Sequence, residues 1–350
     1  PHIDRPERRS VRAVIVREPG EAGFALADVP KPEVSGADVL IEVRTVAINQ
    51  LDLNVIAGVG PGHHARLPRV LGIDPAGIVV AQGTDVPADM IGMRVVAKPN
   101  IACGECSYCA ERREGDCPRQ TVIGVHRDGG AAEFVRVPYR NAIAIGELDF
   151  ATATAAIHSV PIALHTLNAA NGVGPGRTVL VTGAGGALGS AAVQLAAAAG
   201  ARVIAAIRRS DAVVPEGVTT VLHSTPEEML EGVRTNAPDG VDTAIDATGN
   251  GSIAAACVRA LGWGGRLVFC SATVDPEITL DLRSLYLGRR SVVGTASANL
   301  DEAREAIDLV ARGAVVPNIE RHIALDNAIE AYRSFGKRAR GGKVIVHVTD

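Results

Sequence analysis

Four of the six cysteines lie close together in the sequence, as Cys103-x2-Cys106-x2-Cys109-x7-Cys117. Four thiolates at such short spacing can surround one tetrahedral Zn²⁺, and they leave no coordination position for a substrate. An iron–sulfur cluster is the alternative, but the last gap differs from the two-cluster ferredoxin spacing. We therefore predict one structural Zn²⁺ at these cysteines. The other two, Cys257 and Cys270, lie in apolar stretches, which predicts a place in the core.

A glycine-rich turn is the second chemical feature. Thr178–Thr182 is an apolar, β-branched run, glycines follow in a G-x-x-G-x-x-G spacing, and an alanine-rich stretch comes next. Such a strand, turn and helix lets the backbone approach a pyrophosphate, and the free N–H groups of the helix attract its charge. A glycine turn of another α/β protein is the alternative, but a second strand at Arg202–Ile207 completes a dinucleotide-binding unit. We expect cofactor contacts at Gly183, Gly185, Gly186, Ala187, Leu188 and Gly189.

The end of that second strand bears on the choice of cofactor. An NAD site usually has Asp or Glu about 20 residues beyond the glycines, whereas an NADP site offers cationic or hydroxyl groups to the 2′-phosphate. Here the strand is followed by Arg208, Arg209 and Ser210. Guanidinium groups match phosphate geometry, so NADP(H) is predicted. A solvated pair of surface arginines is the alternative.

The elements that position these residues fall into three segments. Residues 1–157 are rich in strand patterns, such as Val11–Val16, Phe24–Val29 and Val39–Ile48. Residues 158–295 alternate strands with helices, which is typical of a doubly wound parallel sheet. Residues 296–350 end in a strand, Lys343–Val348, that we expect to rejoin the first segment. The site is then expected in the cleft between domains, at the carboxyl ends of the parallel strands.

Composition narrows the class of partner. The net charge of −4 gives no electrostatic footprint for nucleic acid or for an anionic membrane. The first ten residues are polar, and no later stretch looks long enough without charge or glycine to cross a bilayer. We expect a cytoplasmic protein with a small-molecule substrate, bound to neither nucleic acid nor membrane.

Several segments together resemble the medium-chain dehydrogenase/reductase family, which includes zinc alcohol dehydrogenases and zinc-free quinone oxidoreductases. They are the cysteine loop and the stretches GVHRDGGAAEFV, VLVTGAGGALGSAAVQLA and GGKVIVHV. The resemblance implies an α/β protein with a GroES-like, β-rich catalytic domain in two segments, 1–157 (with the zinc loop 103–117) and 296–350. A Rossmann domain at 158–295 would lie between them. It also implies hydride transfer with NAD(P)H, and a homodimer or tetramer paired through the strand near Ser291–Ala296.

The sequence departs from the zinc alcohol dehydrogenases at their catalytic metal. Asn49 stands where that pattern has a cysteine ligand, and Gly72-Ile73-Asp74 stands where it has Gly-His-Glu. The third ligand position aligns with His158. Since a catalytic zinc needs about three protein ligands, we predict that this zinc is absent. Asn49 with Asp52 is instead similar to the quinone oxidoreductase branch.

Without a Lewis acid, the predicted reaction is NADPH-dependent reduction of an activated C=C bond (enone or enoyl) or of a quinone, because conjugation spreads the developing charge. Asn49 would orient or polarise the carbonyl, His158 or water would supply a proton, and Asp52 completes the candidate group. The structural alternatives are an N-cap role for Asn49, ion pairing for Asp52 and a core position for His158. Two functional alternatives stay open. One is a zinc-dependent alcohol or polyol dehydrogenase with His63 or His64, Asp74 and His158 as ligands; the other is a non-enzymatic NADPH-binding protein.

Overall fold

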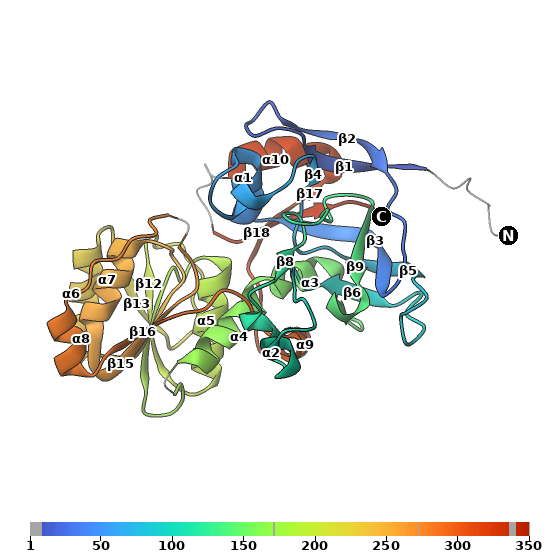
Figure 1. Ribbon diagram of the computed structural model, residues 1–350. Coiled ribbons are helices and arrows are strands. Elements are labelled where there is room, and N and C mark those ends of the chain that lie inside the picture. The colour runs from blue at the N-terminus through green and yellow to red at the C-terminus, as the bar shows by residue number, and fades with distance from the viewer. Residues whose placement is uncertain (1–8, 171, 273, 336–340, 350) are drawn as a thin grey trace. The chain divides into compact units, whose positions relative to one another are not determined.

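The computed structural model describes residues 9–170, 172–272, 274–335 and 341–349 (Figure 1). The chain divides into two compact units. The first unit comprises residues 1–158, 319–339 and 343–350, and the second comprises residues 159–318 and 340–342. The last strand thus belongs with the first segment, as the sequence predicts.

Antiparallel β-structure dominates the first unit. A small sheet has the order β2-β1-β4, and a larger one has the order β10-β6-β5-β3-β18-β17, with β9 also paired to β3. The strands are β1 (Ser10–Val16), β2 (Phe24–Pro30), β3 (Asp38–Ile48), β4 (Arg69–Val70), β5 (Ala76–Gln82), β6 (Arg94–Ala97), β9 (Phe134–Pro138), β10 (Ala142–Ala144), β17 (Ile319–Ala324) and β18 (Lys343–His347). A two-stranded sheet of β7 (Asn100–Ile101) and β8 (Thr121–Val122) borders the cysteine loop.

Short helices complete this unit: α1 (Gln50–Ala57), η1 (Gly60–His64), α2 (Ser107–Ala110), η2 (Glu114–Asp116), η3 (Tyr139–Asn141), α3 (Phe150–Ile157), η4 (Leu325–Asn327) and α10 (Ala328–Phe335). The core joins both parts of the chain. Ile41 and Ile48 of β3 share a buried cluster with Tyr332 of α10 and Val344 of β18. Packing of these apolar side chains fixes the tail strand beside β3.

The second unit is built on a six-stranded parallel sheet with the order β13-β12-β11-β14-β15-β16. Its strands are β11 (Thr178–Thr182), β12 (Arg202–Ile207), β13 (Thr219–Leu222), β14 (Val241–Asp246), β15 (Leu261–Phe269) and β16 (Ser291–Gly294). Helices lie on both sides of the sheet (Figure 1): α4 (Ser159–Ala169), α5 (Ala187–Ala198), α6 (Pro226–Asn236), α7 (Gly251–Ala260), α8 (Leu282–Gly288) and α9 (Leu300–Ala311). This is the predicted doubly wound arrangement.

The structure moves one expected boundary. The second unit continues to Asn318, whereas the sequence placed its end at residue 295. The reason is α9, which packs against α4. Glu302 on α9 accepts hydrogen bonds from the Asn168 amide at 2.9 Å and pairs with the His165 ring at 2.8 Å. The helix therefore belongs to the parallel sheet's unit.

The prediction that no stretch is long and apolar enough to cross a bilayer was wrong for residues 150–169. Residues 150–169 form 20 helical residues with a mean hydropathy of 1.2, which is long and apolar enough to cross a membrane. In the structure 72% of that stretch is buried inside the protein, and α3 packs on β3 while α4 packs on α5. Its apolarity is thus that of core helices.

Candidate functional site

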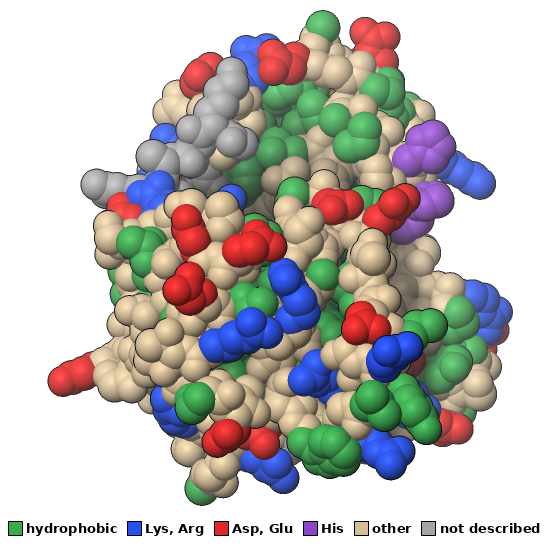
Figure 2. Space-filling view, turned by 90° about the vertical axis from the view of Figure 1, so that its left-hand side faces the viewer, with side chains coloured by type: hydrophobic (Ala, Val, Ile, Leu, Met, Phe, Trp, Pro, Cys, Tyr) green, Lys and Arg blue, Asp and Glu red, His purple; other side chains and the backbone are tan. Residues whose placement is uncertain are grey.

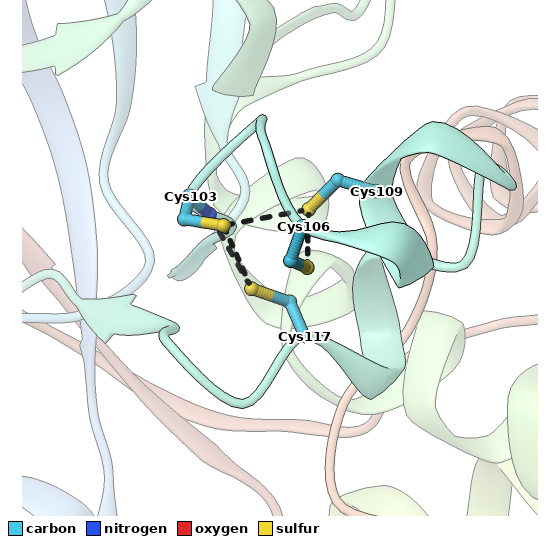
Figure 3. Close-up of side chains that lie close together, drawn as sticks. All are labelled: Cys103, Cys106, Cys109 and Cys117. Atoms are coloured by element: carbon cyan, nitrogen blue, oxygen red, sulfur yellow. Dashed lines mark hydrogen bonds between the residues drawn. The ribbon is translucent and has the colours of Figure 1, made fainter.

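The four cysteines of the loop converge in space (Figure 3). All four Sγ atoms lie within 4.8 Å of one another. The Cys106–Cys109 and Cys103–Cys117 sulfur pairs are both 3.5 Å apart, and Cys103–Cys109 is 3.9 Å. A tetrahedral Zn²⁺ with Zn–S bonds of about 2.3 Å needs sulfurs about 3.8 Å apart. The cluster therefore fits one zinc ion with four protein ligands.

Local structure supplies these ligands from short turns. Gly104 has a positive φ of 80°, which allows the tight turn between the first two cysteines. Cys106 immediately precedes α2, and Cys117 follows η2. A backbone N–H from Glu105 is the main cause that lowers the pKa of Cys103 to about 6, which favours the thiolate that a metal needs. A closed set of four protein ligands gives this zinc a structural role.

The glycine turn has the predicted geometry between β11 and α5. Gly183 has a φ of +66°, and Gly186 is the N-cap of α5. A Cβ on Gly189 would lie 2.2 Å from the Gly183 carbonyl oxygen, so only glycine fits there. The turn thus leaves backbone N–H groups and a helix N-terminus for a pyrophosphate, which fits a dinucleotide.

A further glycine, Gly341, packs against this turn and was not predicted from the sequence. A Cβ on Gly341 would lie 2.3 Å from the carbonyl oxygen of Gly185. The tail therefore runs against the glycine turn just before β18 begins. The GG pair of GGKVIVHV is the only sequence signal for this contact.

At the end of β12, the three predicted phosphate ligands differ in their surroundings. Arg208 and Ser210 are exposed. Arg209 is also exposed, but its guanidinium makes two hydrogen bonds to Asp211, at 2.9 and 2.5 Å. Arg208 is therefore better placed than Arg209 to meet a phosphate, since Arg209 would first have to leave a carboxylate.

A buried polar cluster lies where β3 gives way to α1. The Asn49 amide donates to the Ala47 carbonyl at 3.1 Å and to Asp74 Oδ2 at 2.9 Å. The Lys343 ammonium donates to Asn49 Oδ1 and, at 3.1 Å, to the same Asp74 oxygen. The other Asp74 oxygen accepts the backbone N–H of Ala47 at 2.9 Å. Asn49 and Asp74 were candidate site residues from the sequence, whereas Lys343, the cation that hydrogen-bonds to both, was not predicted.

These bonds change the role of Asn49. It is the N-cap residue of α1, as one alternative held. Both hydrogens of its side-chain amide have protein acceptors, so no amide N–H remains to polarise a substrate carbonyl. The Asn49 amide therefore hydrogen-bonds to both Lys343 and Asp74 in this structure.

Asp52 is buried beside this cluster. Its carboxyl accepts the backbone N–H of Asn49 at 2.8 Å and that of Gly72 at 3.0 Å. Burial nevertheless raises its pKa from 3.8 to about 7, and the nearby Asp74 charge adds to the increase. Asp52 thus ties the backbone at Gly72, in the segment between β4 and β5 that carries Asp74, to the start of α1.

His158 follows α3 and is half-buried. Its ring makes no hydrogen bond with any residue that the structure describes. Burial is the main cause that lowers its pKa to about 4, and the positive charges of Lys343 and Lys98 lower it further. The imidazole is therefore neutral near pH 7. It can donate or accept a hydrogen bond, but it is not the charged acid that the predicted proton transfer requires.

Comparisons with known proteins agree with this architecture. Residues 35–147 match the model of the alcohol dehydrogenase GroES-like domain, and residues 187–312 match that of the zinc-binding dehydrogenase domain. The L-threonine 3-dehydrogenase of Streptomyces coelicolor is 30% identical over 356 residues, covering 96% of this chain and 99% of the relative. The chain belongs to the medium-chain zinc alcohol dehydrogenase family.

Other members of this family differ in reaction and cofactor. The acryloyl-coenzyme A reductase of Sulfurisphaera tokodaii is 26% identical, covering 96% of this chain and 99% of the relative. A zinc-binding dehydrogenase from Sinorhizobium meliloti 1021, solved bound to NADP, is 29% identical with a TM-score of 0.86, covering 97% of this chain and 100% of that one. Further relatives are named alcohol dehydrogenase, L-threonine 3-dehydrogenase or L-galactonate-5-dehydrogenase.

Of the three residues that align with the catalytic metal ligands of zinc alcohol dehydrogenases, Asn49, Ile73 and His158, only His158 is a usual zinc ligand. Ile73 is fully buried and has no ligand atom. Asn49 and Asp74 already hold an ammonium group, and a second cation beside Lys343 would be repelled. The four cysteines are the only group of three or more metal-binding side chains that comes together within the described ranges. His63 and His64 are exposed on η1 and do not join Asp74 and His158 in such a group.

Proposed function

We propose that this oxidoreductase reduces an activated C=C bond, in an enone or an enoyl thioester, or a quinone, with NADPH and without a catalytic zinc. The observation that carries the proposal is the Asn49–Asp74–Lys343 cluster, in which a protein cation is held at Asn49, the position that aligns with the cysteine ligand of zinc alcohol dehydrogenases, and at Asp74, next to the position that aligns with the histidine ligand. The acryloyl-coenzyme A reductases among the relatives show that the family includes enzymes named for such a reduction.

The chemistry of a conjugated substrate suits this site. NADPH would be held by the Gly183–Gly189 turn and would supply the hydride. When hydride reaches the β-carbon, the C=C electrons move to the carbonyl oxygen, and the α-carbon then takes a proton. Fixed hydrogen-bond donors and charges can stabilise that oxygen without a Lewis acid. Because His158 is neutral near pH 7, we assign the proton to water.

Zinc-dependent oxidation of an alcohol or polyol is the second candidate. The names of most of these relatives favour it over the reductase, since they are alcohol, L-threonine 3- or L-galactonate-5-dehydrogenases. It would need a second zinc held by unusual ligands. The ligand positions described above favour the reductase.

Metal analysis combined with an activity screen separates the two candidates. The reductase predicts one zinc per chain, turnover of enones, enoyl thioesters or quinones with NADPH, and activity that survives a mild chelator. Two zincs per chain, with alcohol oxidation that the chelator abolishes, would establish the alcohol dehydrogenase and refute the reductase.

The preference for NADPH rests on Arg208. It is exposed at the end of β12, and no carboxylate lies between Ile207 and Ser210 to repel a 2′-phosphate. The NADP-bound relative from Sinorhizobium meliloti supports this choice, although another solved relative was crystallised with NADH. The ratio of kcat/KM for NADPH and NADH tests it, and a wild-type preference for NADH would refute it.

We also propose a homodimer paired through β16. This strand is the edge of the parallel sheet, and an uncovered edge invites pairing with another strand. Large apolar side chains on β15 and α8 are strongly exposed: Trp263, Leu282, Tyr286 and Leu287. Figure 2, which faces the α6 and α8 side of Figure 1, shows hydrophobic side chains grouped among basic ones. Light scattering on the purified chain should give twice the monomer mass, and Leu282→Glu should lower it to that of a monomer.

A further inference from the structure

Lys343 is a buried cation that neither the glycine turn nor the cysteine loop explains. It is 5% exposed, at the start of β18, and β18 pairs antiparallel with β3. The register sets Val344 opposite Ile48, so the next step brings Lys343 opposite Asn49. The ammonium reaches Asn49 Oδ1, at the position that aligns with the cysteine ligand of zinc alcohol dehydrogenases, and Asp74 Oδ2, next to the position that aligns with the histidine ligand.

We propose that the Lys343 ammonium takes over the electrostatic task of the missing catalytic zinc: it stabilises the negative charge that hydride transfer places on the substrate oxygen. Asn49 and Asp74 are positioning residues, because they hold the ammonium and do not themselves face the substrate. The inference rests on the proposed hydride transfer, and it applies to any substrate whose oxygen gains charge in that step.

The hydrogen-bond inventory supports a contact with substrate. An ammonium has three N–H groups. Two of them have acceptors in Asn49 and Asp74, and the third has none among the residues that the structure describes. A buried donor without an acceptor is costly, so a substrate oxygen at this position would supply the missing partner.

The charged and titratable groups near Lys343 indicate that its positive charge also acts on groups other than Asp74. The charges of Lys343, Asp74 and Lys98 all act on the pKa of the His158 imidazole, so these groups lie in one region of the first unit. Lys98 is buried too, and its ammonium donates to the Asn100 carbonyl at 3.0 Å. Two ammonium groups and a neutral imidazole therefore lie near the Asp74 carboxylate and the Asp52 carboxyl, whose pKa burial raises to about 7 so that it carries only part of a negative charge near neutral pH. Such a site attracts the partial negative charge of an enolate oxygen.

A purely structural ion pair is the competing explanation, and it makes a different prediction. Replacing both partners of a buried ion pair by neutral groups is often tolerated, whereas removal of one partner is strongly destabilising. The double variant Lys343→Met with Asp74→Asn therefore should fold. If the pair is only structural, this variant keeps its activity.

The test compares this double variant with wild type and with Lys31→Met, a control in which a lysine outside the cluster, stacked on Phe134, is removed. We expect the double variant to bind NADPH within a few-fold of wild type while its kcat falls by about 10²–10³, the loss typical of one oxyanion donor. The single variant Lys343→Ala leaves Asp74 unpaired, so it is used only where circular dichroism shows that it folds; it then lacks the side chain that an alkylammonium ion can replace. Added propylammonium should restore part of its kcat, whereas neutral propanol should not.

Three results would overturn the inference. They are a double variant with near wild-type kcat, an effect confined to the affinity for NADPH, and a Lys343→Ala enzyme that no amine rescues. A wild type that turns over only alcohols, with one zinc per chain, would refute the proposed reductase. In that case the kcat of the same variants in alcohol oxidation would still show whether Lys343 stabilises the substrate oxygen. Failure of the proposed reductase and failure of the proposed role of Lys343 are therefore distinguishable.

Discussion

Replacing Asp52 with Asn removes a buried carboxyl whose protonation depends on folding. Burial raises its pKa from 3.8 to about 7, although the N–H groups of Asn49 and Gly72 act in the opposite direction. Between these pH values the folded protein holds a proton on Asp52 that the unfolded chain releases. Because the folded state binds more protons, the free energy of unfolding falls as pH rises through this window.

The size of the effect follows from the same two values. Integration of the linkage relation gives a loss of about 2 kcal/mol from this one group between about pH 5.5 and 8. The Asp52→Asn variant cannot titrate. The stability advantage of wild type over the variant should therefore shrink by that amount across the range. His158 titrates in the opposite sense below its ordinary pKa, but both proteins contain it, so its contribution cancels.

Urea denaturation followed by circular dichroism, repeated across that pH range, measures the difference. Asp28→Asn is the matched control, because Asp28 is an exposed carboxylate on β2 and its replacement should shift stability equally at every pH. A wild-type advantage that stays constant, or grows with pH, would show that Asp52 is ionised in the folded protein. The burial argument would then be wrong.

Three further predictions concern the metal and the cofactor. Changing Cys103 and Cys117 together to Ser should remove the single zinc, seen by metal analysis, and lower the Tm of the first unit, because the loop loses its cross-link; retained zinc would contradict the ligand assignment. Arg208→Ala should raise the KM for NADPH by about 10- to 100-fold, the worth of one charge-assisted hydrogen bond, and leave that for NADH unchanged. Arg209→Ala should have a smaller effect, because Arg209 is held by Asp211, and equal effects would refute the distinction. Gly189→Ala forces a Cβ to within 2.2 Å of the Gly183 oxygen, so titration calorimetry should show weaker binding of both cofactors, and unchanged affinity would mean that the turn does not hold the pyrophosphate.

Local patterns were enough to predict much of the molecule. The four cysteines lie within one loop, so their spacing alone indicated that they converge. The glycine turn needed only the strand before it and the helix after it, and β12 begins and ends at the residues predicted from the sequence, Arg202 and Ile207. The boundary near residue 295 was missed because α9 has an ordinary amphipathic pattern. Nothing local says that Glu302 meets His165 on α4.

Lys343 shows why the rest of the site could not be read from the sequence. It lies 294 positions from Asn49, and its partnership depends on the register of β18 against β3. A lysine next to two glycines in a tail looks like a solvated end, yet the sheet carries it into the interior. A buried ammonium needs a carboxylate partner, and Asp74 supplies one from the segment between β4 and β5. Lys343 and Asp74 therefore depend on each other: without Lys343 the Asp74 carboxylate would be an unpaired buried charge, and a second cation beside Lys343 would be repelled.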